Sequence, residues 1–532
     1  MNRLRATILL ALLCGASAAL AGCAAGLAAA QHPAGTLVVI EPADANTLNP
    51  LYANNEPSFL YYGLIFDGLT APGPNFSTIP WLATSWSSDP SHRHWQVNLR
   101  RGVTWSDGAP FTSRDVIFTW QTMLDPKVGF PYAGMFDYVK RVVAEGPYRI
   151  RFELSSPNVL FVAQALGSPI LPEHILGKIP PGQQRLSSFG EHPIGTGPYE
   201  LVSWKHDESV LFARNPHWWH GPAKIPRIEF RIVLDDQTRV DAISSGAADL
   251  ADSLVAQDYR SLLQLAPSLH YVHIPDLFSR FIFVNMTLPG LSDLAVRQAM
   301  EYGWDRRAIV QGLLHGDAVL NATITPVALH DWHAPIAPFP YDPARARKLL
   351  AAAGYKAGPG GVLRRARTKL AFTLDLPTGD LTLGQIAAEF QADMRALGIA
   401  ISIQSLDYPT FIDRTNAMHY TLALSGWGGT TDPDEYTFLH SSQIVPVGNN
   451  ETGFKNATVD RDLVMGLRTF NPARRRRYYD QMQRIVAREL PCLWLYDQYF
   501  QVAYGDRLAL DTHQMQPDLL FWWNVYDWRL RS

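Results

Sequence analysis

The sequence predicts an α/β protein of more than one domain. Residues 23–532 are too many for one hydrophobic core, and predicted strands alternate with predicted helices along them. The clearest unit is a strand at 369–376, a helix at 381–397 that ends at Gly398, and a strand at 399–403. One helix between two strands makes a βαβ unit, whose strands pair in parallel. The fold class is therefore α/β.

The N-terminus has the pattern of an export signal. Arg3 and Arg5 precede an apolar run at residues 6–13, and small residues lead from it to Cys23. The segment is too short to be a membrane-spanning helix. Residues 20–23 resemble a bacterial lipobox, so we expect a signal peptide at 1–22, a lipid on Cys23 and a flexible tether over 23–35. Ordinary secretory cleavage, with Cys23 an incidental thiol, is the alternative.

Charge and cysteine usage exclude several classes of protein. Once Arg3 and Arg5 are removed, acidic residues outnumber basic ones, so no basic excess points to nucleic acid. No segment after the signal has the length and apolarity of a membrane span. With Cys14 removed and Cys23 acylated, Cys492 has no partner for an intrachain disulfide. Its apolar neighbours predict a buried, unreactive thiol.

The segment 95–124 is predicted to be a strand, two turns and a helix. Apolar and polar residues alternate from Trp95 to Leu99, as in a half-buried strand. Thr112 is a candidate N-cap, and Asp115 follows three residues later as in a capping box. The apolar residues after it, Trp120 among them, lie on one helical face. We predict a folding unit here and not a binding site.

Part of this segment resembles a known family. The run LRRGVTWSDGAPFTSRDVIFTW, residues 99–120, is similar to the signature of the family 5 extracellular solute-binding proteins, the dipeptide, oligopeptide and nickel receptors of ABC importers. Residues 194–199 also resemble the family, as do residues 215–219, where Trp218 replaces the usual Tyr. The resemblance implies a two-lobed, periplasmic-binding-protein-like fold of the large type II, with an extra subdomain in lobe one and a ligand cleft between the lobes.

The resemblance also implies how the chain divides between the lobes. Lobe one would cover 36–277, with the extra subdomain at about 55–190, and lobe two would cover 278–492. Residues 493–532 would return to lobe one. The aromatic pattern after Leu490 itself predicts strand-like structure through to Trp528. Two strands, near Phe278 and Leu493, would then cross between the lobes and act as the hinge.

The implied function is ligand capture without chemistry. A monomeric receptor would enclose a peptide or related small solute by hinge closure and pass it to permease subunits in the inner membrane. No cofactor and no metal are expected. A secreted peptide hydrolase, or a sensor or chaperone that reuses the fold, remains the alternative. The chain contains no G-x-S-x-G, H-E-x-x-H or C-x-x-C pattern, so the common hydrolase and zinc signatures are missing.

Three histidine pairs are spaced closely enough in the sequence to be candidate metal ligands. They are His92 with His94, His217 with His220, and His330 with His333. Each pair lies in a predicted loop and has no evident third ligand, whereas tight zinc sites use three or four. We therefore predict no metal centre.

The predicted binding site follows the strand at 420–424. Ligands bind beyond the carboxyl ends of strands in open α/β sheets, and Gly429 lets backbone approach a ligand while Trp427 offers a flat face. Peptide-binding members of the resembling family carry an Asp three residues after this Trp, and it holds the amino group of the peptide. Here that residue is Thr430, which has no charge, so Asp432 is the nearest replacement. A tight loop with Trp427 in the core is the alternative.

Three further residues are expected to face the cleft. Asn54 and Glu56 lie in a predicted polar loop, for which a plain solvated loop is the alternative, and Phe278 begins the first crossing strand.

Overall fold

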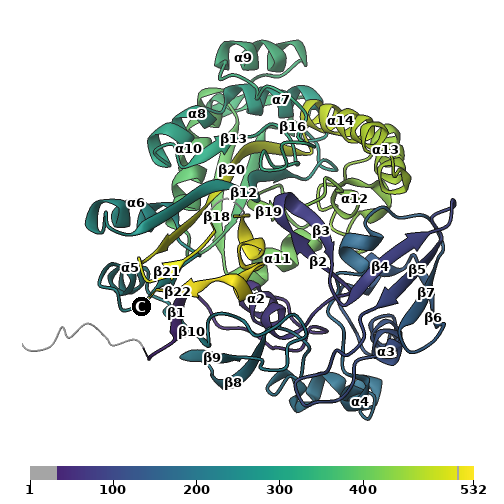
Figure 1. The fold of residues 1–532 in the computed structure, drawn as a ribbon. Coiled ribbons are helices and arrows are strands. Elements are labelled where there is room, and N and C mark those ends of the chain that lie inside the picture. The colour runs from purple at the N-terminus through teal and green to yellow at the C-terminus, as the bar shows by residue number, and fades with distance from the viewer. Residues whose placement is uncertain (1–32, 512–514, 532) are drawn as a thin grey trace, which may run out of the picture.

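One large sheet runs through both halves of the molecule. The computed structural model describes residues 33–511 and 515–531 (Figure 1), so the predictions for the signal peptide and Cys23 lie outside the described residues. The sheet has the order β18-β17-β19-β12-β20-β11-β1-β10-β9-β8, and β13 pairs with β20 at one side. Its two longest strands, β12 (His270–Val284) and β20 (Cys492–Tyr504), pair antiparallel in the middle. They connect the two lobes seen above and below them in Figure 1.

The first lobe is built on the half of the sheet that contains β1. Strand β1 pairs in parallel with β10 on one side and with β11 on the other. The strands of this half are β1 (Thr36–Glu41), β8 (Tyr199–Lys205), β9 (Ser209–Arg214), β10 (Arg227–Ile232) and β11 (Leu250–Ala251). Its helices are α2 (Glu56–Ile65), α5 (Asp236–Ser244) and α6 (Ala256–Leu265).

A separate four-stranded antiparallel sheet extends from this lobe. Its order is β4 (Ala83–Ser88), β5 (His94–Leu99), β7 (Arg149–Leu154) and β6 (Val139–Ala144). Helix α3 (Ser113–Met123) packs on it and begins with the predicted capping box, in which Thr112 and Asp115 bond each other's backbone. The strand and the capped helix predicted for 95–124 are thus confirmed. A hairpin of β2 (Thr70–Gly73) and β3 (Ser77–Pro80) and helix α4 (Glu173–Leu176) lie nearby.

The second lobe contains the predicted βαβ unit. Strand β17 (Ala371–Pro377), helix α10 (Leu381–Ala396) and strand β18 (Ala400–Leu406) follow in order, and β17 pairs with β18 in parallel as predicted. Strand β19 (Leu422–Gly428) lies between β17 and β12. The remaining elements are α7 (Leu294–Gly303), α8 (Arg306–Ala308), β13 (Ala318–Leu320), α9 (Pro343–Ala352), β14 (Lys356–Ala357), β15 (Leu363–Arg365), β16 (Thr368–Lys369), α11 (Tyr408–Asn416), α12 (Tyr436–Leu439), α13 (Ala457–Arg468) and α14 (Pro472–Glu489).

Alternating residues of β12 supply two separate cores. Ile282 and Val284 belong to the apolar cluster under α7 and α10, whereas Phe281 and Phe283 belong to the cluster under α13 and α14. A strand buried on both faces reads as a continuous apolar run, which is why 278–285 was recognisable as a strand. The strand begins eight residues earlier than predicted, at His270.

The C-terminal segment differs from its prediction. We expected strand-like structure as far as Trp528, but β20 ends at Tyr504 and only the short β21 (Leu508–Ala509) and β22 (Arg529–Leu530) follow among the described residues. Two 3₁₀ turns, Asp518–Trp522 and Val525–Asp527, hold most of the aromatic residues. The prediction was wrong because aromatic side chains can pack into a core without lying in a strand. The ring centres of Trp522 and Trp528 are 4.8 Å apart in the lobe-one core.

Two other predictions concern Cys492 and the membrane. Cys492 is fully buried in β20, and burial raises the pKa of its thiol well above the ordinary value, as expected for an unreactive cysteine. Among the described residues, no helix combines the length and apolarity that crossing a membrane requires.

Candidate ligand-binding site

The predicted loop around Trp427 is largely strand. Strand β19 continues through Gly428, where we had placed the end of the strand near Leu424. Trp427 pairs with Ser279 and Gly428 pairs with Phe278 of β12. The Gly429 N–H then donates to the Leu277 carbonyl at 2.7 Å. Trp427, Gly429 and Phe278 are therefore brought together at the point where β12 passes between the lobes.

One edge of β19 is open beside these residues. Strand β17 pairs with β19 only at Leu422 and Ala423, and no strand of the described chain covers that edge from 424 to 428. Residues bonded to β12 alternate along β19: Thr421 accepts from Asn285 and Gly429 donates to Leu277. In an antiparallel ladder every second residue bonds the partner strand, and the residues that alternate with these turn their N–H and C=O groups to the opposite edge. Those residues include Gly426 and Gly428.

Phe278 covers the two glycines. A Cβ built on Gly426 would lie 2.2 Å from the Phe278 ring, so no other residue fits there without displacing it. The Arg280 guanidinium lies 4.7 Å from the centre of the same ring. Phe278 is half-buried between backbone and guanidinium, on the face of β19 opposite to Trp427.

Trp427 is half-buried on the other face. Its ring lies 5.0 Å from that of Phe438, and its indole N–H is hydrogen-bonded to Glu435. Burial, together with the charges of Asp434 and Asp432, raises the pKa of Glu435 well above its usual range. Part of the Trp427 surface is thus fixed by the core, and part reaches solvent.

Asp432 is committed to an ion pair within lobe two. Its two carboxylate oxygens accept from Arg475 at 2.5 and 2.6 Å, and the side chains of Arg475 and Asp432 are only 6% and 16% exposed. Thr430 forms a local turn with Asp432: its hydroxyl donates to the Asp432 carbonyl at 2.9 Å. Thr430 is uncharged, and Arg475 compensates the charge of Asp432, so neither predicted site residue offers a free negative charge in this arrangement.

Asn54 and Glu56 lie at the start of α2. The Asn54 side chain is exposed, and its backbone N–H donates to Asn46 at 3.1 Å. Asn55 caps the helix, and Glu56 is its first residue. Glu56 lines a small pocket that also contains Glu41, Asp252 and Asp518.

Sequence reasoning missed the acidic partners of Glu56. The pocket residues come from positions 41, 56, 252 and 518, so no local motif joins them. The protein around Glu56 reduces the hydration of its carboxylate, and this desolvation, with the charges of Asp518, Asp252 and Asp276, raises its pKa to about 7. Asp276 connects the two regions, because it precedes Leu277, the residue bonded to Gly429.

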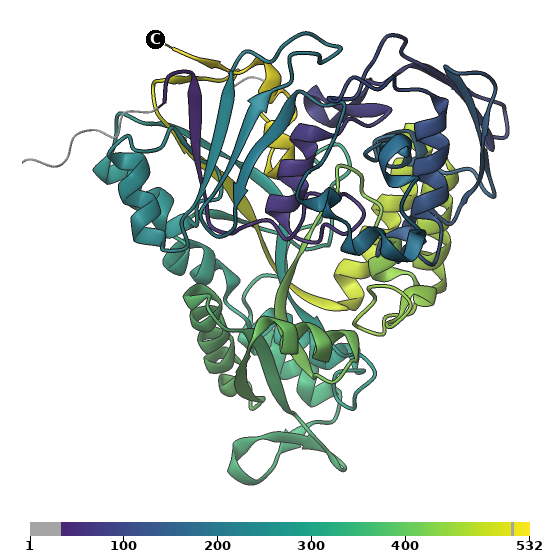
Figure 2. The same ribbon diagram turned by 90° about the horizontal axis from the view of Figure 1, so that it is seen from below.

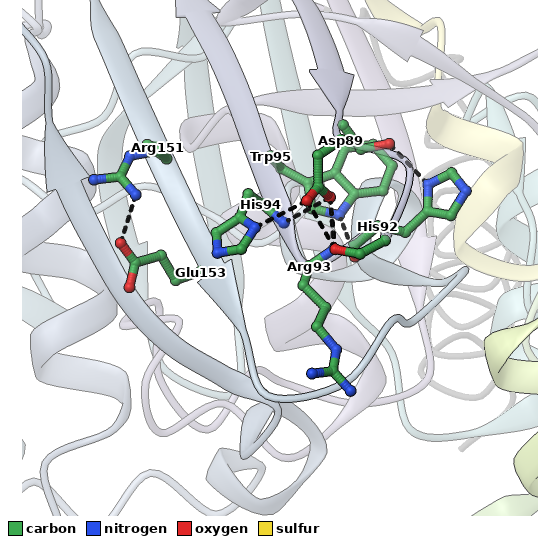
Figure 3. A network of polar contacts seen from close by, with 9 residues as sticks. Asp89, His92, Arg93, His94, Trp95, Arg151 and Glu153 are labelled. Atoms are coloured by element: carbon green, nitrogen blue, oxygen red, sulfur yellow. Dashed lines mark hydrogen bonds and ion pairs between the residues drawn. The ribbon is translucent and has the colours of Figure 1, made fainter.

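In two of the histidine pairs the two rings bond different residues. The His330 ring bonds Asp331 and the His333 ring bonds the Thr325 carbonyl, each at 2.9 Å. His92 bonds Ser88 at 2.8 Å, whereas His94 bonds Asp89 at 3.0 Å (Figure 3). In the described chain no group of three or more His, Cys, Asp or Glu side chains is placed to hold a metal ion.

A second pocket, of about 270 Å³, lies on lobe one between α2, β2 and the C-terminal segment. Trp81 and Tyr526 are among its lining residues, whereas none of the predicted ligand-site residues lines it.

Comparison with known proteins identifies the family. The model of the bacterial extracellular solute-binding proteins, family 5, matches residues 77–444, which is most of the chain. The chain belongs to this family. Its members are extracytoplasmic binding proteins rather than enzymes, and the two-lobed α/β fold is the family fold. The comparisons therefore support the predicted substrate-binding protein of an ABC transporter over the hydrolase and sensor alternatives.

Individual relatives cover nearly the whole length. The oligopeptide-binding protein AppA of Bacillus subtilis is 26% identical, over 93% of this chain and 92% of its own. Protein XP55 of Streptomyces lividans is 29% identical, over 88% and 87%. The crystal structure of NikZ from Campylobacter jejuni with Ni(L-His) has a TM-score of 0.82 and 27% identity, and the match covers 94% of this chain and 100% of that one.

Proposed function

We propose that this protein is the substrate receptor of an ABC importer and that it binds a short peptide in extended conformation along the open edge of β19. The observation that carries the proposal is that Gly426 and Gly428 turn backbone N–H and C=O groups to an uncovered edge. An extended peptide added to a sheet edge gains main-chain hydrogen bonds. Peptide binding by the relative AppA supports this ligand class over the nickel complex held by NikZ.

The side chains around this edge would shape the site. Trp427 contacts the ligand from one face of β19, Phe278 closes the other face, and Gly429 and Thr430 border the end of the strand. Asn54 and Glu56 face them from lobe one. Asp432 has a structural role instead, because Arg475 already occupies both of its oxygens.

The two long strands would act as the hinge. The pairing of β12 with β20 shifts register between Pro275 and Ser279, beside the site. A bulge of this kind interrupts the ladder and lets a strand bend. The proposed lobes are 36–277 with the subdomain at about 55–190, then 278–492, with 493–532 returning to lobe one. Closure would bury the peptide and present the closed form to the permease.

Calorimetry with peptide analogues tests the proposal. The probes are trialanine and two analogues of it, each with an ester in place of one of the two amide bonds. Trialanine should bind. At least one analogue should bind about threefold to tenfold more weakly, because it lacks one N–H donor. Equal affinities for all three compounds would contradict pairing along β19. Recovery of intact trialanine after incubation distinguishes binding from hydrolysis.

We also propose that Cys23 carries the lipid that holds the receptor on the outer side of the membrane. The support is the lipobox-like sequence at 20–23. A diacylglyceryl group with a further acyl chain gives stable anchoring. Cys23→Ala should release the protein into the soluble fraction, and retention in the membrane fraction would contradict the anchor.

A further inference from the structure

The pocket at Glu56 lies at the carboxyl ends of two parallel strands. Glu41 is the last residue of β1, Asp252 directly follows β11, and Asp518 begins a 3₁₀ turn of the C-terminal segment. Ligands of open α/β sheets bind at such strand ends. Apolar walls come from residues such as Leu60, Phe500 and Trp522. The pocket's free volume is about 10 Å³, enough for one group the size of a water molecule.

Two buried oxygens in this pocket have no hydrogen-bond partner in the part of the chain that the structure describes. Asp252 accepts from the Trp522 indole N–H through Oδ2 at 2.6 Å, but its Oδ1 is unpaired, as is Glu41 Oε1. Glu41 is 3% exposed and Asp252 is 6% exposed. A buried polar atom without a partner costs free energy. These two oxygens therefore mark acceptor positions that a donor group would satisfy.

Four acidic side chains line the pocket, and none of the described residues supplies a matching cation there. No Lys or Arg side chain from residues 33–511 or 515–531 lines it. Arg239 acts on Glu41 from a distance, while its guanidinium is bonded to Asp236 and to two carbonyls. Desolvation raises the pKa of Asp252 to about 6, and burial with the charges of Asp252 and Glu56 raises that of Glu41 well above normal. The carboxylates thus lack the positive partner that would favour their ionised forms.

Resting on the function proposed above, we propose that this pocket holds one alkylammonium group of the ligand. An ammonium group has three N–H donors, a positive charge and the size that the free volume admits. The acceptors would be Asp252 and Glu41 inside the pocket and Glu56 and Asp518 at its mouth. The pocket would thus provide an acidic anchor from lobe one. Thr430 has no acidic group, and Asp432 is already paired with Arg475.

Asp518 offers a variant that preserves the backbone. It has a φ of 60°, a left-handed conformation that Asn adopts as readily as Asp. Asp518→Asn combined with Glu56→Gln therefore removes two charges from the mouth with little change of shape. The matched control is Glu208→Gln with Asp331→Asn, which removes two charges from side chains that are 68% and 80% exposed and do not line the pocket.

The experiment is calorimetry on the full mature chain with four probes. Trialanine has a free α-ammonium group, N-acetyl-trialanine has none, N-acetyl-Ala-Lys-Ala-amide has only the lysine ammonium, and cadaverine is a plain diamine. We expect an ammonium-bearing peptide to bind at least about tenfold more tightly than N-acetyl-trialanine. The pocket variant should remove that difference, whereas the control variant should keep it. Comparison of the two ammonium-bearing peptides identifies the source of the group.

The outcomes separate this inference from the peptide function. Equal affinity for acetylated and free peptides, or a preference that survives in the pocket variant, overturns the ammonium pocket and leaves the receptor function intact. A preference lost in Asp434→Asn instead would place the anchor in lobe two. If no peptide binds but cadaverine binds and depends on Glu56 and Asp518, the pocket stands and the peptide function falls. Absence of binding by all four probes overturns both.

Discussion

Trp427 divides its contacts between the core and the proposed ligand. One ring contact is with Phe438, and the indole N–H bonds Glu435, yet the side chain is only half-buried. Trp427→Ala should therefore weaken trialanine binding by about tenfold or more, since aromatic side chains dominate many binding interfaces. The melting temperature should fall much less than it would on replacement of a fully buried Trp by Ala. Calorimetry and thermal unfolding measure the two effects.

The matched variant is Trp427→Phe, which keeps a ring and removes the N–H bonded to Glu435. It should retain most of the affinity. Normal trialanine affinity in Trp427→Ala would remove this residue from the site.

Asp432 should behave as a structural residue. Removal of one partner of a buried ion pair leaves the other charge uncompensated, at a cost of about 3–5 kcal/mol. Asp432→Asn should lower the free energy of unfolding by part of this amount, because the Asp432 side chain keeps some solvent contact. Urea unfolding gives the stability change, and calorimetry on the folded fraction should show unchanged trialanine affinity. A loss of affinity without a loss of stability would restore Asp432 as a ligand anchor.

At the residue scale, the sequence indicates some site residues and hides others. Trp427 stands among glycines in the last part of β19, and these glycines mark its position in the local sequence. Asp252 and Asp518 lie 266 positions apart with nothing local to mark them, and only the parallel pairing of β1 with β11 and the return of the C-terminal segment bring them together. Asp432 lies two residues from Thr430, the position where the resembling family has its acid. Its ion-pair partner Arg475 lies 43 residues away, so the local sequence does not reveal the pair.

Helix α3 shows how far local signals determine an element. Trp120 is 1% exposed and packs edge-on against Phe136 and Phe152, with ring centres 5.4 and 5.7 Å away. Trp120→Ala should lower the free energy of unfolding by about 3–5 kcal/mol. The ligand affinity of the folded protein should barely change, because α3 lies on the separate four-stranded sheet.

Urea unfolding with trialanine calorimetry checks this prediction. Trp120→Phe is the control, since it retains ring packing and should cost less. A large affinity loss with normal unfolding would show that 95–124 contributes to the site.

Elements with both a periodic pattern and a cap are marked in the local sequence. Helices α9, α10 and α14 each begin beside an Asp or Asn that caps the helix, and two of them have Pro at the first position. The start of β12 was not predictable in the same way, because residues 270–277 include histidines, a proline and an aspartate. Those residues become strand through pairing with β20, which is a tertiary effect.

The whole molecule should be less stable at neutral than at mildly acidic pH when no ligand is bound. Burial raises the pKa of Asp434 and Glu451 to about 7 and that of Asp252 and Asp276 to about 6, and Glu56 is raised to about 7. An acid with a higher pKa in the folded state holds its proton longer there than in the unfolded chain. Stability therefore falls as pH rises from the unfolded pKa of about 4 through the folded values.

The measurement is urea unfolding between about pH 5 and about pH 8. Glu56→Gln should flatten the decline, because one of the titrating groups is gone, whereas the exposed Glu208→Gln should leave it unchanged. A stability that rises steadily over this interval would show that other ionisable groups control it.

Hinge closure should depend on a contact far from the β19 edge. The His92 ring stacks on Phe470 at 3.8 Å, and the Val159 N–H donates to the Leu467 carbonyl at 2.8 Å. These contacts join the four-stranded sheet to the region of α13 and α14, which lie close together in both views (Figures 1 and 2). If the lobes rotate about β12 and β20, these contacts would form in the closed molecule and break in the open one.

Phe470→Ala should therefore favour the open form. Loss of a ring stack worth about 0.5–1.5 kcal/mol would weaken trialanine binding by at most about tenfold. The radius of gyration from small-angle scattering with saturating trialanine should be larger than for the wild type. His92→Ala should act in the same way, and the double variant should add little, since the two residues make one contact. A radius that is the same with and without bound trialanine in the wild type would contradict closure altogether, because the stack would then be a permanent part of the fold.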